Sequence, residues 1–156
     1  MNTITPNNYV LCSGIGNSPF KVSAFDRALI SAGVSDYNLI KVSSILPPLS
    51  IEKNKLTLPK GSLLPSAFSA IYSNQLGETI SASVAVGIPV NDNEIGVIMK
   101  YSDTVGKTES ESIVRHLVEK AMQDRGIAIK NIVSTSAECV VKSQEYFCAF
   151  ATVSMW

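Results

Sequence analysis

The stretch NLIKVSSILPP, residues 38–48, sets the architecture expected for this chain. Its first nine residues, 38–46, are mostly apolar and partly β-branched, and they predict a strand. Pro47 and Pro48 lack a backbone N–H, so they end that strand or place it at a sheet edge. Two adjacent hydroxyl side chains, Ser43 and Ser44, are therefore expected near the end of a strand, just before a rigid turn.

Upstream of this stretch, the sequence predicts one strand and one helix. Residues 9–13 favour a short strand, and the glycines of GIGNSP, residues 14–19, favour a turn. Apolar residues at helical spacing then predict a helix over 23–33. Ser23 is expected to cap the first turn of this helix, and Gly33 is expected to end it.

Downstream, residues 49–66 are polar and contain prolines, so we expect an irregular loop with at most one short strand. In TISASVAVGIP, residues 79–89, apolar side chains alternate with small ones, which predicts a strand with two different faces. The full set of strands predicted in this part of the chain is 67–73, 79–89, 95–102, 129–141 and 146–156.

A second helix is predicted over 109–125. Thr108 and Glu111 have the spacing of a capping box, and Gly126 is expected to end the helix. The order of the elements predicts a single α+β domain over residues 1–156, with helices covering sheet faces. The apolar stripe of the second helix is expected to contain Ile113, Leu117, Ala121 and Met122.

The composition argues against several classes of protein. Lysine plus arginine and aspartate plus glutamate both number 13, and this balance argues against a general nucleic-acid binder. No apolar run approaches the ~18 residues that cross a bilayer, and the first residues lack the basic start and apolar core of a signal peptide. We therefore expect a cytoplasmic protein without membrane or nucleic-acid partners.

Two further features bear on assembly and metal binding. Charged residues make up 17% of the chain, below the ~25% that is typical, so we expect copies of the same chain to cover part of the surface. The three cysteines show no CxxC spacing, and the one histidine, His116, is expected at the surface of the second helix. The sequence therefore predicts buried thiols and no metal site.

The serine pair at 43–44 favours a specific chemistry. A serine hydroxyl held beside the preceding carbonyl can attack it and move the acyl group from nitrogen to oxygen, which requires a sharply turned peptide. Elimination of the resulting ester, followed by hydrolysis, leaves a ketone at the new N-terminus, a pyruvoyl group. Such a group condenses with an amine and accepts electrons from a breaking bond, as pyridoxal phosphate does in other enzymes.

The sequence resembles the pyruvoyl-dependent arginine decarboxylases over nearly its whole length. The resemblance implies a four-layer αββα sandwich, a homotrimer or dimer of trimers, and active sites between subunits. It implies self-cleavage between Ser43 and Ser44 into chains of residues 1–43 and 44–156, a pyruvoyl group derived from Ser44, and conversion of L-arginine to agmatine and carbon dioxide. The blocks that carry the resemblance are AFDRALISAG, NLIKVSSILPP, GSLLPSA, GETISASVAVGIP, GVIMKY and CAFATVSMW, in the family's order.

The resemblance implies roles for two further residues. Asp26, in AFDRAL, matches the family aspartate that pairs with the substrate guanidinium, and a carboxylate suits the planar fork of that group. Asn38, in NLIKVSS, matches an asparagine implicated in processing and positioning, where a side-chain amide would hold the oxyanion of self-cleavage.

Lys100, in GVIMKY, departs from the family pattern, which has glutamate there. In the family this glutamate looks like the general acid that returns a proton to the α-carbon. A lysine with its ordinary pKa of about 10.4 is a poor donor at neutral pH, and a cation there opposes a cationic substrate by about 1–4 kcal/mol at 4 Å.

Three explanations for Lys100 stay open. The substitution disables turnover but not processing, and the chain then serves as a non-catalytic partner of an active homologue. Alternatively, the chain acts on another amino acid, one whose anionic group contacts Lys100. In the third explanation a different acid, such as Glu78 in GETISA, replaces the missing glutamate.

Overall fold

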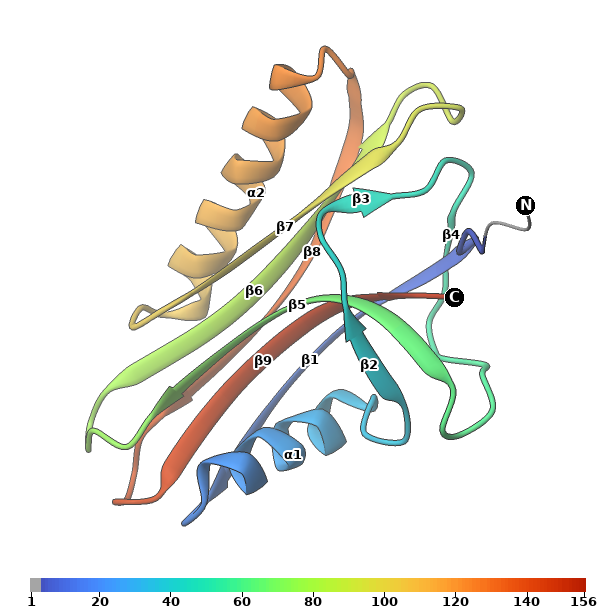
Figure 1. The fold of residues 1–156 in the computed structure, drawn as a ribbon. Coiled ribbons are helices and arrows are strands. Elements are labelled where there is room, and N and C mark those ends of the chain that lie inside the picture. Colours follow the sequence, from blue (N-terminus) through green and yellow to red (C-terminus); the bar gives the residue numbers. More distant parts are fainter. Residues whose placement is uncertain (1–3) are drawn as a thin grey trace.

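The computed structural model describes residues 4–156, in which two helices and nine strands form a single α+β domain (Figure 1). One sheet has five strands in the order β2-β5-β9-β1-β4, and the other has four in the order β3-β7-β6-β8. No helix in this part of the chain is both long enough and apolar enough to span a bilayer. The elements are β1 (Asn8–Ser18), α1 (Lys21–Ala32), β2 (Asn38–Lys41), β3 (Ile45–Leu46), β4 (Ile51–Glu52), β5 (Leu63–Ser73), β6 (Thr79–Pro89), β7 (Gly96–Asp103), α2 (Lys107–Asp124), β8 (Ile129–Val140) and β9 (Tyr146–Met155).

The five-stranded sheet is centred on β9, which pairs antiparallel with β1 on one side and with β5 on the other. Helix α1 packs against β1 and β9. A Cβ atom on Gly14 or Gly16 of β1 would lie 2.5 Å from a backbone oxygen of α1. The predicted turn over 14–19 is therefore wrong: these glycines lie inside a strand, because the helix approaches it too closely for side chains.

The alternation predicted for β6 is confirmed. Its small side chains face α2: the Ser83 and Ser110 hydroxyl oxygens lie 2.6 Å apart, and a Cβ atom on Gly87 would lie 2.7 Å from Val118. Its apolar side chains belong instead to the core that the two sheets share, where they meet alternate residues of β9. The buried members of that core from these two strands are Ile80, Ala82, Val84, Val86, Ala149, Ala151, Val153 and Met155.

Both helices begin before the residues predicted to cap them. The N-cap of α1 is Phe20 and that of α2 is Gly106, and neither makes a side-chain capping bond. Ser23 and Thr108 lie inside the first turns and cap nothing, so both capping predictions are wrong. The end predicted for α1 is confirmed, because Gly33 has a left-handed backbone with φ of 78°.

Glu111, the other half of the predicted capping box, faces β8, where it accepts hydrogen bonds from the hydroxyls of Ser134 and Ser136. Glu138, also from β8, accepts the Lys107 N–H at 2.6 Å and so serves the start of α2. An acid brought from another element thus replaces the local cap, and local spacing could not predict it.

Two members of the stripe predicted for α2, Ala121 and Met122, are buried as predicted. Toward the start of the helix the buried face is rotated from the prediction: Val114 and Val118 are fully buried, whereas Leu117 is 37% exposed. His116 is exposed and lies 3.5 Å from Glu119, which confirms the prediction of a surface histidine. Two of the three cysteines are buried, as predicted, and burial raises the pKa of Cys148 to about 12.

Candidate functional site

The chain passes from one sheet to the other at the serine pair, so the single strand predicted over 38–46 is two strands. The last hydrogen bond to the five-stranded sheet is donated by the Val42 N–H to β5 (3.1 Å). The first bond to the four-stranded sheet joins the Ser44 carbonyl to the Ile98 N–H of β7 (2.7 Å). Ser43, whose side chain is exposed, lies between these two anchors, and Ser44 is half-buried.

This crossing fixes the position of the serine pair between the two sheets. Because its two ends belong to different sheets, the Ser43–Ser44 peptide cannot continue either ladder of hydrogen bonds. A cavity of about 260 Å³ lies beside it. Its lining residues are Ile4, Pro6, Val42, Ser43, Ile45, Pro47, Pro65 and Met155.

Asn38 and Asp26 have different surroundings in the structure. Asn38 begins β2, and its side-chain amide donates to the Gly61 carbonyl at 2.8 Å. With Phe25 and Lys41 it lines a second cavity of about 320 Å³. Asp26 lies on the exposed side of α1 and lines neither of these two cavities. Within one chain, neither cavity brings Asp26 and the serine pair together.

Lys100 lies close to the serine pair. It follows Ile98, the partner of Ser44, by two residues along β7, and alternate residues of a strand share a face. From the other sheet, Lys41 ends β2 three residues before Ser44. A groove of about 320 Å³ separates the two strands that carry these lysines. Its lining residues are Lys41, Phe68, Ser69, Ala70, Lys100, Tyr101 and Ser102.

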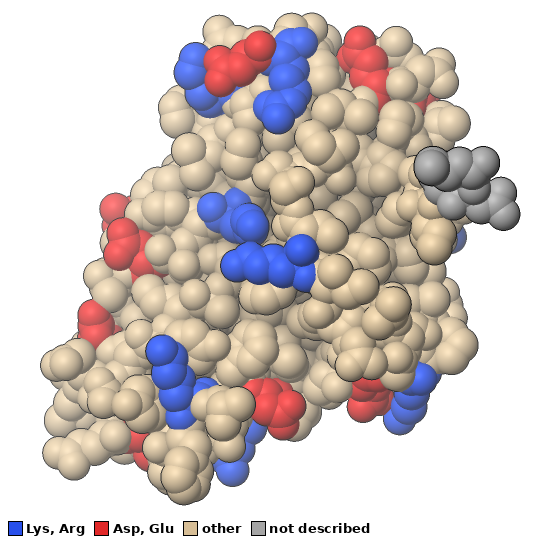
Figure 2. Space-filling model, viewed as in Figure 1, with Lys and Arg blue, Asp and Glu red and all other residues tan. Residues whose placement is uncertain are grey.

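The groove is positively charged. Burial and the charge of Lys41 both lower the pKa of Lys100. Among the described residues neither lysine forms an ion pair, and the Lys41 ammonium lies 5.0 Å from the centre of the Phe68 ring. Figure 2 shows basic side chains together near the middle of this face, with acidic ones toward its margins. Lys41 could not be singled out from the sequence, because the single strand predicted over 38–46 does not bring it to Lys100.

Glu78 lies far from the serine pair. Ile98, which binds Ser44, is opposite Val86 of β6. Glu78 precedes β6 and lies eight residues before Val86, which corresponds to roughly 26 Å along an extended chain. Its carboxylate accepts a hydrogen bond from the Ser73 hydroxyl. Within one chain, Glu78 is therefore poorly placed to replace the missing acid.

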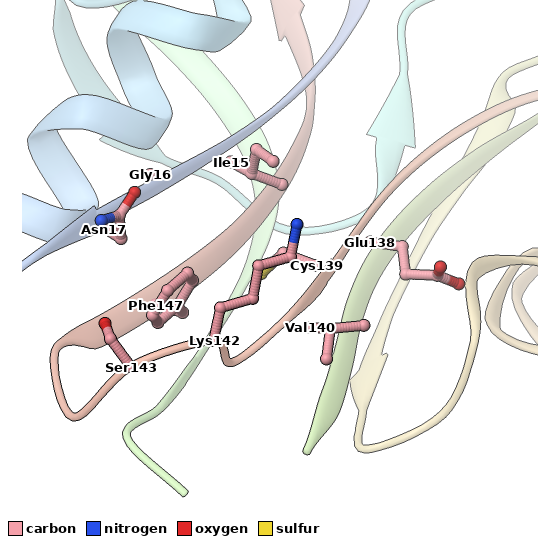
Figure 3. Close-up of a pocket in the computed structure, with 9 residues that line it drawn as sticks. All are labelled: Ile15, Gly16, Asn17, Glu138, Cys139, Val140, Lys142, Ser143 and Phe147. Atoms are coloured by element: carbon pink, nitrogen blue, oxygen red, sulfur yellow. The ribbon is translucent and has the colours of Figure 1, made fainter. Parts of the chain in front are cut away.

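A larger cavity of about 550 Å³ lies elsewhere, between β1 and the connection from β8 to β9 (Figure 3). Of its polar groups, the Glu138 carboxylate already accepts the Lys107 N–H, and Asn17 donates to Glu145 at 2.6 Å. The residues that line this cavity include one serine, Ser143, and no pair of adjacent serines. The residues that line it are Ile15, Gly16, Asn17, Glu138, Cys139, Val140, Lys142, Ser143 and Phe147.

Comparison of the sequence with known proteins identifies a family. The family model for pyruvoyl-dependent arginine decarboxylase matches residues 8–156. The pyruvoyl-dependent arginine decarboxylase of Methanococcus aeolicus is 41% identical over 151 residues, covering 97% of this chain and 90% of that protein. Those of Methanocaldococcus jannaschii and Pyrococcus furiosus are 37% and 35% identical, over 97% and 92% of this chain and 90% and 92% of their own lengths. The similarity thus includes both sheets, both helices and the serine pair.

Proposed function

This chain belongs to the pyruvoyl-dependent arginine decarboxylase family, and from that premise we propose that it cleaves itself between Ser43 and Ser44 and decarboxylates L-arginine. Cleavage gives chains of residues 1–43 and 44–156, the second beginning with a pyruvoyl group. The products from arginine are agmatine and carbon dioxide. The observation that carries the proposal is the crossing between sheets at this serine pair, with a backbone anchor on either side.

The anchors support a stepwise cleavage. The Ser44 hydroxyl oxygen attacks the Ser43 carbonyl carbon, so that an ester C–O bond forms as the peptide C–N bond breaks and the nitrogen takes up the hydroxyl proton. Loss of the Ser44 α-proton then expels the Ser43 carboxylate, and water replaces the nitrogen of residue 44, which leaves as ammonia. Because the Val42 N–H and the Ser44 carbonyl stay bonded to their sheets, the reacting atoms remain close together.

The neighbouring residues fit a pyruvoyl group at position 44. When present, its ketone condenses with the substrate amine and draws electrons from the bond to the carboxylate. The Ile98 N–H holds the carbonyl next to that ketone. In this proposal Asn38 stabilises the oxyanion of self-cleavage in a neighbouring copy, because five residues of extended chain, roughly 16 Å, separate it from Ser43 of its own chain.

Asp26 binds the substrate guanidinium through paired charge-assisted hydrogen bonds in this proposal. Since Asp26 lines none of the cavities beside its own chain's serine pair, a neighbouring copy supplies it. We therefore include in the proposal a homotrimer or dimer of trimers with active sites between subunits. Each chain forms a four-layer αββα sandwich, an arrangement supported by a helix packed on each sheet and a core shared by the sheets.

Lys100 favours a second function, in which arginine turnover is weak or absent. It occupies the position of the family's proton donor, and together with Lys41 it confronts a cationic substrate with two positive charges. In this case the chain acts on a different amino acid, or serves as the non-catalytic partner of an active homologue in a mixed trimer. Burial and the charge of Lys41 both lower the pKa of Lys100, which is the direction that favours proton donation near neutral pH.

Release of labelled carbon dioxide from carboxyl-labelled L-arginine tests the proposed reaction. We expect slow release from the processed protein, because Lys100 donates a proton less readily than a carboxylic acid does at neutral pH. No release from fully processed protein, combined with co-purification of a homologue that has glutamate at this position, supports the non-catalytic function instead.

A further inference from the structure

The groove lined by Lys41 and Lys100 is positively charged, and the proposed decarboxylation of arginine does not require this charge. Lys41 comes from one sheet and Lys100 from the other, and both line the same groove of about 320 Å³. We propose that this groove binds a carboxylate group of a small molecule between the two ammonium groups. The inference rests on the proposed function only in treating that molecule as the amine substrate.

The side chains around the two lysines suit an anion. Ser69 of β5 and Ser102 of β7 add hydroxyl groups to the lining, and no acidic residue is among the described residues that line the groove. The Phe68 ring lies 5.0 Å from the Lys41 ammonium and restricts where this long side chain can lie. Donors from two strands thus line one groove, where Lys41 is exposed and Lys100 is partly buried, and donors of this kind suit a small anion.

The charge balance also favours an anion. Two like charges that share a partly buried groove repel each other, and no described acid forms an ion pair with either. A carboxylate placed between them reverses this unfavourable interaction and satisfies both ammonium groups. The volume of the groove, about 320 Å³, is sufficient for a molecule of amino-acid size.

The carboxylate has two sources that fit this chemistry. It is the α-carboxylate that any amino-acid substrate carries, or the side-chain carboxylate of an acidic amino acid. In the first case, the amine product has lost the group that the lysines hold, and it dissociates more readily than the substrate. In the second case, the two lysines select acidic substrates over arginine.

Isothermal titration calorimetry on the full-length Ser44→Ala chain measures the site without the pyruvoyl group, so its outcome is independent of self-cleavage. The probes are succinate, L-glutamate, L-arginine and agmatine, at neutral pH and low salt. We expect succinate to bind, and agmatine, which lacks a carboxylate, to bind at least about tenfold more weakly than L-arginine, the loss expected for one charge-assisted hydrogen bond. Equal affinity for L-glutamate and L-arginine indicates that the two lysines bind the α-carboxylate. A tenfold or greater preference for L-glutamate indicates that they bind its side-chain carboxylate.

Charge-reversal variants locate the site. Lys100→Glu and Lys41→Glu, each added to Ser44→Ala, should each weaken succinate binding by about tenfold or more. Lys130→Glu, on an exposed position of β8, makes the same change in net charge and should leave succinate binding unchanged. Succinate binding that survives both groove variants, or agmatine binding as tightly as L-arginine, would overturn the proposal. Circular dichroism confirms that each variant is folded.

Discussion

Replacing Ser44 with alanine should abolish self-cleavage completely and leave one chain of 156 residues. Alanine keeps the size of the side chain close to that of serine but removes the oxygen that attacks the Ser43 carbonyl. The backbone anchors at Val42 and Ser44 use N–H and C=O groups, which alanine retains, so the crossing between sheets should stay in place. Denaturing electrophoresis after long incubation measures the effect.

Ser43→Ala is the matched control for this experiment. In the proposed cleavage, Ser43 contributes only its backbone carbonyl, and its side chain is exposed. The Ser43→Ala protein should therefore still yield both fragments. Fragments from Ser44→Ala, or an intact chain from Ser43→Ala with normal processing in the wild type, would contradict the assignment of the attacking hydroxyl.

Replacing Lys100 with glutamate should raise kcat for L-arginine by about 100-fold, the lower end of what a well-placed general acid contributes. The glutamate supplies a carboxylic acid at the position where the family has one, on the same strand, β7, that binds the Ser44 carbonyl. Only the protonated carboxyl donates, so kcat of this variant should fall as pH rises through the pKa of that new group. KM should rise at the same time, because the variant removes one partner of the substrate carboxylate.

Two controls separate the acid from the charge. Lys100→Gln removes the cation without supplying an acid, and it should leave kcat low. Lys130→Glu changes the net charge equally at an exposed position of β8 and should change neither kcat nor KM. If fully processed Lys100→Glu protein shows no gain in kcat, position 100 is not the proton-donor position in this chain.

Periodic patterns predicted the elements of this fold well where both faces of an element pack against other elements of the chain. The alternation in β6 is an example, because its small side chains fit under α2 and its larger ones enter the core between the sheets. The start of α2 was mispredicted for a physical reason: its first N–H group, that of Lys107, donates to Glu138, which lies on a strand that follows the helix. The turn predicted at Gly14 and Gly16 was wrong for a similar reason, because the helix that packs closely against these glycines comes later in the chain.

Only part of the candidate site could be predicted from the sequence. The serine pair and its prolines stand out as a short motif, but the change of sheet between Val42 and Ser44 depends on pairing with two distant strands. Lys41 shows the consequence, because it becomes a partner of Lys100 only after that change. Local spacing carries no information on such long-range pairing, so the positive groove could be found only in the folded chain.

Intact mass spectrometry of the freshly purified, correctly assembled protein distinguishes a self-cleaved chain from an uncleaved one. We expect two species, residues 1–43 ending in a normal carboxylate and residues 44–156 beginning with a pyruvoyl group in place of serine. A single species with the mass of all 156 residues, unchanged after prolonged incubation, would contradict it.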